Sequence, residues 1–228
     1  MQQRSEEWFA HRRGKVTASE VHKVMPGRAG KYLKARDEYL TTKINEVLGI
    51  GEDKTFPASV REAMAHGTKY EPVARDAYEW MTGELIIEPT GKHAITDHPE
   101  VKGLCASPDG IWASDQKRLI EIKCPYSISS QPELIRLELE EVPKDDERWN
   151  RLIRDEYKWQ MHCQMACTGA THCDFVQFDP RVEEGFQTFV IPFPRNEEKI
   201  DALLAETLKF LEEVHDHVEK RRKHGQGI

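Results

Sequence analysis

The sequence predicts an α/β fold in which a mixed β-sheet is flanked by helices. The chain has 228 residues, which suffices for one domain, or two small ones, with a sizeable buried core. Helical patterns fill its first third, short strand-like runs fill the middle, and a helix, two strands and a last helix follow. Because no apolar run reaches about 18 residues, no membrane span is expected. We expect one domain over residues 1–228, with a helical part (1–83), a sheet core (84–194) and a C-terminal helix (195–228).

Capping and breaking residues mark the helices of the first third. Ser5 is a favourable N-cap for a first helix, and Gly14 is a favourable stop. Thr17 and Glu20 have the spacing of a capping box at the start of a short second helix, which ends before Pro26. The expected helices cover residues 6–13, 18–25, 32–48, 59–65 and 68–81.

Runs rich in branched residues alternate with turn residues from residue 84 onward. The run at 119–123 has the strongest strand pattern, and 114–117 has the composition of a hairpin connection. The expected strands cover residues 85–87, 93–95, 103–107, 110–113, 119–123, 173–178 and 186–193. Helices are expected from 132, with a break near 143, from 149 to 167, and from 196 onward.

One pair of expected strands brings reactive side chains together. Asp109 opens the first strand of the hairpin, and Glu121 lies near the end of the second. The turn between them places both carboxylates at the same end of the pair. Glu121 and Lys123 are two residues apart and share one face of the strand, opposite Ile120 and Ile122. Two carboxylates and one ammonium group therefore converge at an edge of the sheet.

Neighbouring carboxylates repel each other unless a cation joins them. Oxygen ligands of this kind suit Mg²⁺ or Mn²⁺, which retain waters and bind phosphate. A lysine beside such an ion can orient a water or help to deprotonate it, which suits the hydrolysis of phosphodiesters. The same residues also fit an ordinary exposed hairpin with alternating charges, and their spacing alone does not decide between the two interpretations.

Charge is unevenly distributed along the chain. The formal net charge is −7 at pH 7, which by itself argues against a nucleic-acid partner. Residues 1–36, however, contain nine Lys and Arg residues against three Glu residues, and a second basic cluster lies at 220–224. The average therefore conceals a basic N-terminal segment. The five cysteines, without an apolar signal segment, predict reduced thiols and a cytoplasmic location.

Six short motifs occur in order over residues 8–181. They are Trp8-x-x-x-Arg12-x-Gly14-x-x-Thr17-Ala18-Ser19-Glu20, Gly67-Thr68-Lys69-Tyr70-Glu71, Cys105-Ala106-Ser107-Pro108-Asp109-Gly110, Glu121-Ile122-Lys123-Cys124-Pro125, Tyr157 to Gln160, and Phe178-Asp179-Pro180-Arg181. Together they resemble phage lambda exonuclease and its YqaJ-type alkaline exonuclease relatives. The third motif has one residue inserted after the cysteine. The pair Pro108-Asp109 and Glu121-x-Lys123 is similar to the signature of the PD-(D/E)xK nuclease superfamily.

The resemblance implies a restriction-endonuclease-like core and a metal-dependent 5′→3′ exonuclease. Such an enzyme acts on linear double-stranded DNA, releases 5′-mononucleotides and leaves 3′ single-stranded tails for recombination. Two Mg²⁺ ions per active site are implied, with Mn²⁺ as a substitute. Asp109 would bridge the ions, Glu121 and the carbonyl of Ile122 would bind one, Glu71 would serve the other, and Lys123 would position or activate the attacking water. Without the resemblance, Glu71 would be interpreted as a first-turn acid favoured by the helix dipole.

A pocket for the terminal 5′-phosphate is implied at Arg12, Ser19, Ser107 and Gln160. A guanidinium group binds phosphate through two parallel hydrogen bonds. Ser19 lies at a helix start, where the dipole favours an anion. Two simpler interpretations stay open, because Ser19 also fits an ordinary helix-start residue and Gln160 a buried structural amide.

Two further residues are implied as DNA contacts. Arg28 matches an arginine that touches the duplex, although an arginine between glycines also fits an exposed loop. Met64 matches an apolar residue that separates the strands, although methionine also fills gaps in a core. The resemblance implies a homotrimer that encircles DNA ends, and a single-strand annealing recombinase as partner. It also implies a bacterial cytoplasm with a phage or prophage gene.

Two other functions stay open at the level of the sequence. One is a PD-(D/E)xK endonuclease of the restriction or repair type, and the other is a DNA-end-binding protein with weak catalysis. Cys163, Cys167, His172 and Cys173 could suggest a metal cluster, but they lack the paired spacing of such sites. Cys124 could suggest a nucleophile, but no His or Asn partner is evident.

Overall fold

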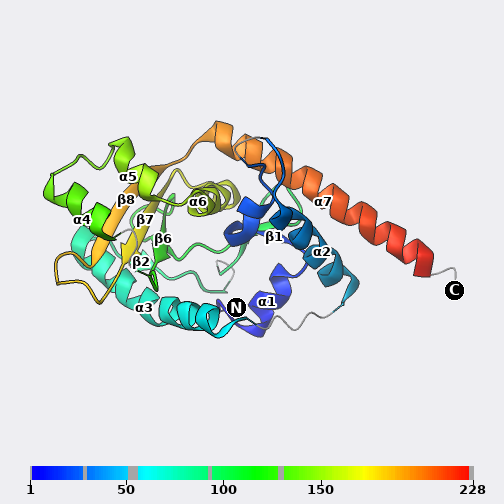
Figure 1. Cartoon of the computed structure of the whole chain (residues 1–228), viewed down its shortest axis with the longest axis horizontal. Coiled ribbons are helices and arrows are strands. Elements are labelled where there is room, and N and C mark those ends of the chain that lie inside the picture. Colours follow the sequence, from blue (N-terminus) through cyan, green and yellow to red (C-terminus); the bar gives the residue numbers. More distant parts are fainter. Residues whose placement is uncertain (1, 28–29, 51–55, 92–93, 128–130, 226–228) are drawn as a thin grey trace.

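A five-stranded mixed β-sheet lies at the centre of the computed structural model, which describes residues 2–27, 30–50, 56–91, 94–127 and 131–225. The strand order is β2-β5-β6-β7-β8 (Figure 1). β6 and β7 are parallel and the other neighbours are antiparallel, which confirms the predicted α/β class with a mixed sheet. The strands are β2 (Ile86–Ile87), β5 (Gly110–Trp112), β6 (Arg118–Lys123), β7 (His172–Phe178) and β8 (Thr188–Pro194).

A second, three-stranded sheet has the order β1-β4-β3. Its strands are β1 (Val16–Thr17), β3 (Thr96–Asp97) and β4 (Leu104–Ala106). β1 is parallel to β4, whereas β3 is antiparallel to it. The sequence does not predict this sheet, because the pairing of β1 with β4 joins segments that are far apart in the chain. The N-terminal part therefore contributes a strand as well as helices.

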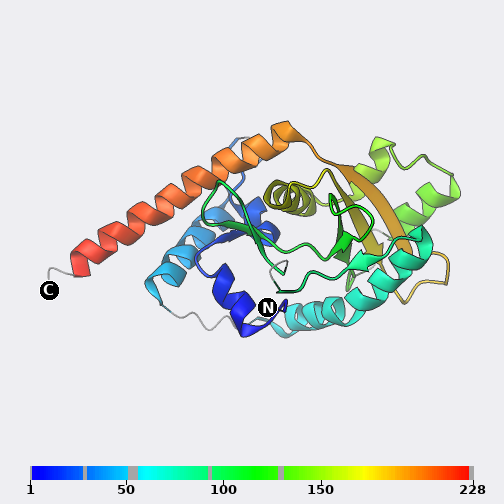
Figure 2. The ribbon, with the colours of Figure 1, turned by 180° about the vertical axis from the view of Figure 1, so that it is seen from behind.

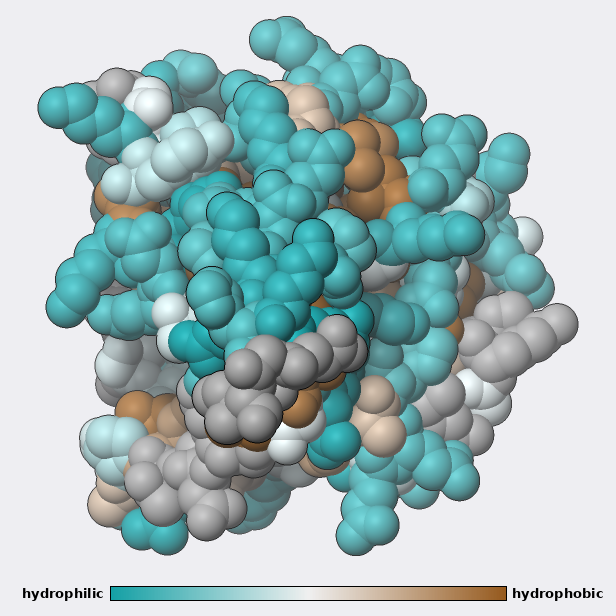
Figure 3. All heavy atoms as spheres, turned by 90° about the vertical axis from the view of Figure 1, so that its right-hand side faces the viewer, coloured by the Kyte–Doolittle hydropathy of each residue, from teal (hydrophilic) through white to brown (hydrophobic). Residues whose placement is uncertain are grey.

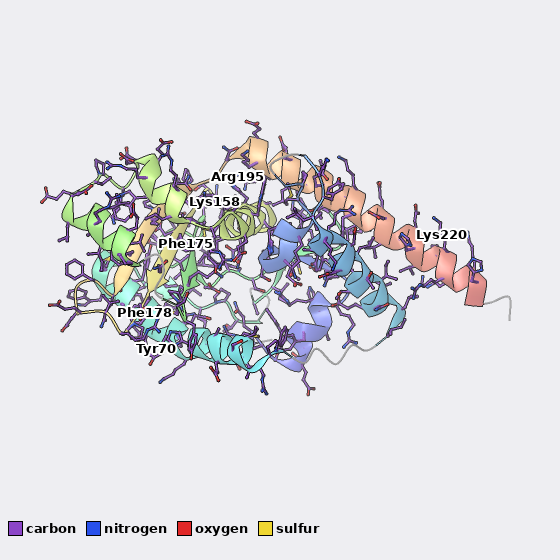
Figure 4. All side chains as sticks on the ribbon, viewed as in Figure 1. Tyr70, Lys158, Phe175, Phe178, Arg195 and Lys220 are labelled. Atoms are coloured by element: carbon purple, nitrogen blue, oxygen red, sulfur yellow. The ribbon has the colours of Figure 1, made fainter. Side chains whose placement is uncertain are left out.

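Helices cover both faces of the larger sheet. On one face, α3 (Ala58–Thr82) packs Ala74 and Tyr78 against Ile120 and Ile122 of β6. Phe178, labelled in Figure 4, belongs to the same cluster, and Tyr70, also labelled there, packs against it. The opposite face packs on α4 (Gln131–Leu139), α5 (Glu147–Leu152) and α6 (Asp155–Thr168), with Leu119 of β6 and Phe175 of β7 in the core. Alternate residues of β6 therefore face opposite layers, as the pattern predicts.

The remaining helices enclose the smaller sheet. They are α1 (Glu6–Arg12), the 3₁₀ helix η1 (Ala18–Lys23), α2 (Lys34–Leu48) and α7 (Glu197–Gly225). Tyr39 of α2 stacks on Phe210 of α7, with 5.3 Å between the ring centroids. Figures 1 and 2 show α7 projecting beyond the sheets, and Lys220 lies near its far end in Figure 4. Figure 3 shows that this end of the molecule is largely hydrophilic. None of the helices among the described residues could span a bilayer.

Two predicted helix boundaries are wrong. The helices expected at 59–65 and 68–81 are one 25-residue helix, α3, with Gly67 in its interior. Glycine costs about 1 kcal/mol in a helix interior, and packing of the helix on the sheet outweighs that cost. The helix expected at 149–167 is divided into α5 and α6, because Ile153 and Arg154 adopt extended backbone.

Two smaller predictions also fail. The strand expected at 93–95 begins later, as β3 at Thr96, and residue 93 lies outside the described residues. The capping box at Thr17 and Glu20 is absent, because the Thr17 side chain makes no capping hydrogen bond. Glu20 instead accepts a hydrogen bond from Lys23 at 2.7 Å. A 3₁₀ helix of six residues forms at this position.

Candidate active site

The hairpin of β5 and β6 brings Asp109, Glu121 and Lys123 together, as their spacing predicts. Gly110 pairs with Ile120 across the hairpin, so Asp109 lies at the end that Glu121 also occupies. The backbone N–H of Ile122 donates to Asp109 Oδ2 at 2.8 Å. The Lys123 ammonium forms an ion pair with Glu121 Oε1. The site is thus held by backbone hydrogen bonds of the sheet and not only by side-chain contacts.

Three acidic side chains crowd together at this point. Burial raises the pKa of Asp109 well above its usual range, and the neighbouring carboxylates Glu121 and Glu71 raise it further. Burial alone would lower the pKa of Lys123, but Glu121 and Asp109 outweigh it and the net shift is upward. Three carboxylates therefore lie close together, and the repulsion between Asp109 and its two acidic neighbours favours a bound cation.

Gln164 also belongs to the site, although none of the sequence motifs includes it. Its amide Nε2 donates to Glu121 Oε2 at 2.6 Å, and both side chains are fully buried. Gln164 lies four residues after Gln160 on α6, so both project from one face of that helix. Gln160 Oε1 accepts a hydrogen bond from Lys123 Nζ at 3.3 Å. The four-residue spacing from Gln160 predicts that Gln164 lies on the same face of the helix, and this pattern is visible in the sequence.

Glu71 is not a first-turn acid, because α3 begins well before it at Ala58. One carboxylate oxygen, Oε2, lies 2.5 Å from Arg4 Nη2, and the other, Oε1, lies 3.5 Å from Arg75 Nη2. Arg75 Nη2 also donates to the backbone carbonyl of Asp109 at 3.0 Å. Arg75 therefore ties α3 to the start of β5. Arg4, too, lies outside the sequence motifs that predict the site.

A cavity of about 460 Å³ opens over this cluster. It is lined by the five residues expected to act on the ions and the water, and Ser19, Gln160 and Met64 also line it. Met64 is 55 % exposed as a whole residue, so the alternative of core packing is wrong. Arg28 lies outside the described residues. The five expected residues are Glu71, Asp109, Glu121, Ile122 and Lys123.

A smaller cavity of about 130 Å³ adjoins the first and shares Arg4, Ser19, Asp109 and Gln160 with it. All four residues expected to bind a terminal phosphate line this smaller cavity, namely Arg12, Ser19, Ser107 and Gln160. Gln160 is also buried, so its structural interpretation and its place in the site are compatible.

Trp8 contacts two of the residues that line the smaller cavity, Arg12 and Ser107. The Arg12 guanidinium lies over the Trp8 ring at 3.9 Å from its centroid, and Arg12 Nη2 donates to Ser19 Oγ at 3.2 Å. The Trp8 indole N–H donates to Ser107 Oγ at 3.1 Å, which leaves the hydroxyl proton of Ser107 free to donate to a ligand. Burial lowers the pKa of Arg12. Within the described ranges no carboxylate forms an ion pair with Arg12, so its charge is available for an anion.

The cysteines show no functional site. All five are free, and Cys163, Cys167 and Cys173 are buried. No group of three or more His, Cys, Asp or Glu side chains in the described part of the chain is arranged to hold a metal ion by itself. Burial raises the pKa of the Cys124 thiol to about 12, which disfavours a nucleophilic thiolate.

The donor set nevertheless fits one hard cation that completes its shell with water and phosphate. Mg²⁺ typically takes one or two carboxylates in such sites and keeps several waters. Asp109 and Glu121 supply two carboxylates beside the cavity. Glu121 Oε1 is buried and accepts no hydrogen bond from any described residue, so its contact is the ion pair with Lys123. A second cation at Glu71 fits less well, because both its oxygens face arginines.

The fold and sequence are similar to those of known exonucleases. Residues 7–171 match the YqaJ-like viral recombinase domain. An alkaline exonuclease from Laribacter hongkongensis, LHK-Exo, is 35 % identical with a TM-score of 0.77, over 98 % of this chain and 100 % of that chain. The structure of LHK-Exo with dAMP gives the same values. A phage-related exonuclease from Haemophilus somnus 129PT shares the fold at 16 % identity, with a TM-score of 0.66 over 91 % and 96 % of the two chains. No curated protein matches the chain.

Proposed function

Because the chain belongs to the YqaJ-like viral recombinase family, as its six motifs indicate, we propose that it is a metal-dependent 5′→3′ exonuclease on linear double-stranded DNA. It releases 5′-mononucleotides and leaves 3′ single-stranded tails. LHK-Exo, which is similar over nearly the whole chain, is an alkaline exonuclease and has been solved with dAMP. That similarity supports a nuclease that binds a nucleotide in this site.

The observation that carries the proposal is the pair of adjoining cavities with opposite preferences. The larger holds an excess of carboxylates and favours cations, whereas the smaller holds an arginine without an acidic partner and favours an anion. Asp109 lines both. A strand end with its 5′-phosphate in the smaller cavity would therefore present the next phosphodiester to the carboxylates. This arrangement favours an exonuclease over an endonuclease, which has no need of a pocket for a strand end.

In the larger cavity, Asp109, Glu121 and the carbonyl of Ile122 would hold one Mg²⁺, for which Mn²⁺ would substitute. Glu71 with Asp109 would serve a second. When bound, such ions lower the pKa of water and stabilise charge on the phosphate. Lys123 positions or activates the attacking water through its ammonium group, and Glu121 is kept in place by the buried amide of Gln164.

In the smaller cavity, Arg12 pairs with the two oxygens of the terminal phosphate, and the hydroxyls of Ser19 and Ser107 donate to it. Gln160 completes the pocket and contacts Lys123, which joins the two cavities. Met64, exposed at the larger cavity, separates the strands of the duplex.

The wider expectations form part of the same proposal. They are a homotrimer around DNA ends, a single-strand annealing recombinase as partner, and a bacterial cytoplasm with a phage or prophage gene. The family's description as a viral recombinase domain supports the recombination partner.

A digest of linear duplex labelled at one 5′ end tests the proposal. With Mg²⁺, the full chain should release labelled mononucleotides from 5′-phosphorylated ends, act more slowly on 5′-hydroxyl ends, and spare closed circular DNA. Arg12→Gln should reduce the preference for the phosphate, whereas Arg151→Gln, in α5, should not. Cleavage of closed circles would indicate an endonuclease. Tight binding of ends without any release would indicate a DNA-end-binding protein.

A further inference from the structure

Residues 2–5 form a tight turn beside the candidate active site. The N–H and the hydroxyl of Ser5 donate to the carbonyl of Gln2 at 3.2 and 2.7 Å. Gln3 Nε2 donates to the carbonyl of Pro108, the residue before Asp109, at 3.0 Å. In both Figure 1 and Figure 2 the N-terminus is drawn between α1 and the first half of α3. The turn is thus fixed to the segment that carries a proposed metal ligand.

This turn directs the Arg4 side chain to the site, where it lines both cavities. The guanidinium of Arg4 takes one oxygen of Glu71, and the guanidinium of Arg75 takes the other. The Glu71 side chain is 15 % exposed, so water provides little of its solvation. Both of its oxygens are therefore occupied by positive charge supplied by the protein.

The backbone of Arg4 is strained. Its φ angle is 66°, in the left-handed region that disfavours residues with a Cβ atom. Such conformations persist where surrounding contacts hold them, and they cluster at functional sites. The contacts of Gln3 and Ser5, on either side, hold this one.

The two arginines differ in how firmly they are held. Arg75 also donates to the backbone of Asp109, and its side chain is only 11 % exposed. Arg4 makes its ion pair with Glu71, and its side chain is 46 % exposed. The Arg4 guanidinium is therefore the more exposed of the two and has fewer contacts at the site.

We propose that Arg4 is the counter-ion of Glu71 in the metal-free protein, and that a divalent cation bound at Glu71 displaces it. The inference rests on the two-cation form of the proposed function. Arg4 is a positioning residue: it holds Glu71 in place before the cation arrives, and it weakens the second cation site relative to the first.

The test counts bound Mn²⁺ by electron paramagnetic resonance of the free ion, in a titration of the full chain without DNA. The wild type should show one tighter and one weaker site. Arg4→Gln should tighten the weaker site about three- to tenfold, because the competing ion pair is of moderate strength. Arg4→Lys, which keeps the charge, should leave that site weak. Arg136→Gln is the matched control, since Arg136 also pairs with carboxylates, lies in α4 and has a 55 % exposed side chain.

A double-mutant cycle separates displacement from general electrostatics. In a Glu71→Gln background, Arg4→Gln should no longer alter Mn²⁺ binding. An equal tightening in that background, or an unchanged weaker site in Arg4→Gln alone, would overturn the proposal. A single Mn²⁺ site in both the wild type and Arg4→Gln would overturn it too. Each of these outcomes is independent of the digest of DNA, which tests the nuclease activity itself.

Discussion

Gln164 offers a sharp test of how the carboxylate Glu121 is supported. In Gln164→Leu a side chain of similar size replaces the amide, so the buried volume is kept while the donor to Glu121 Oε2 is lost. The other contacts of the amide are weak, at 3.5 Å to the carbonyl of Ser107 and 3.8 Å from the Cys173 thiol. Nearly all of the effect should therefore act through Glu121.

The size of the effect follows from the 2.6 Å hydrogen bond to a buried carboxylate. A hydrogen bond to a charged group contributes about 1.5–3 kcal/mol. We therefore expect the free energy of unfolding of the metal-free protein to fall by about that amount. We also expect the affinity for Mn²⁺ to fall. The same free-energy range corresponds to about 10- to 150-fold in a dissociation constant. This agrees with the loss of about 10- to 100-fold in metal affinity or activity that follows removal of a hydrogen-bond partner of a metal ligand.

Three measurements test this prediction. Urea unfolding without metal reports the stability, calorimetric titration reports the affinity for Mn²⁺, and the release of mononucleotides reports the rate of the reaction. Gln187→Leu is a matched control, because Gln187 Nε2 donates to the carbonyls of Pro180 and Val182 at 3.4 and 3.1 Å in a separate loop. The control should lose stability but keep its affinity for Mn²⁺. If Gln164→Leu also kept that affinity and the wild-type rate of release, Gln164 would be a core residue without a role in the site.

Three further changes separate charge, packing and phosphate binding. The pKa of Asp109 is raised in the folded protein, so between the ordinary Asp pKa of about 4 and that raised pKa the folded chain binds a proton that the unfolded chain does not. The free energy of unfolding of the metal-free protein should therefore fall as pH rises through this range. Asp109→Asn should flatten this loss in thermal melts across pH, and an unchanged slope would contradict it. Gly110→Ala would put a Cβ 2.3 Å from Ile86 Cγ2 and should cost about 1–3 kcal/mol in urea unfolding, whereas a wild-type midpoint would refute the crowding. Trp8→Phe keeps a ring for Arg12 but removes the indole donor to Ser107. The preference for 5′-phosphorylated over 5′-hydroxyl ends, measured as the ratio of their KM values, should fall about three- to tenfold, while the affinity for Mn²⁺ stays unchanged. An unaltered preference would exclude this role of Trp8.

The hairpin of β5 and β6 could be predicted because its geometry is local. A short turn and the two-residue period of a strand suffice to bring Asp109, Glu121 and Lys123 to one place. The two cavities also hold the expected residues, apart from Arg28, which lies outside the described part of the chain. The residues that line these cavities beyond the hairpin are predicted by the family motifs and not by sequence spacing.

The missed residues depend on tertiary structure. Arg4 and Glu71 are 67 residues apart, and Gln164 and Glu121 are 43 apart, so no local pattern relates them. The continuity of α3 has a similar cause. By intrinsic propensity Gly67 favours the end of a helix, but packing of the helix on the sheet outweighs that preference.

The segment from Ser107 to Asp109 crosses from the smaller sheet to the larger one, since β4 ends at Ala106 and β5 begins at Gly110. Ser107 lines the cavity proposed for the terminal phosphate, and Asp109 belongs to the carboxylates proposed to direct cleavage. Two residue steps span at most about 7 Å, so the covalent chain limits the distance between the Cα atoms of Ser107 and Asp109. Under the proposed function, the backbone at the junction of the two sheets therefore helps to limit the length of the released product, whichever base is removed.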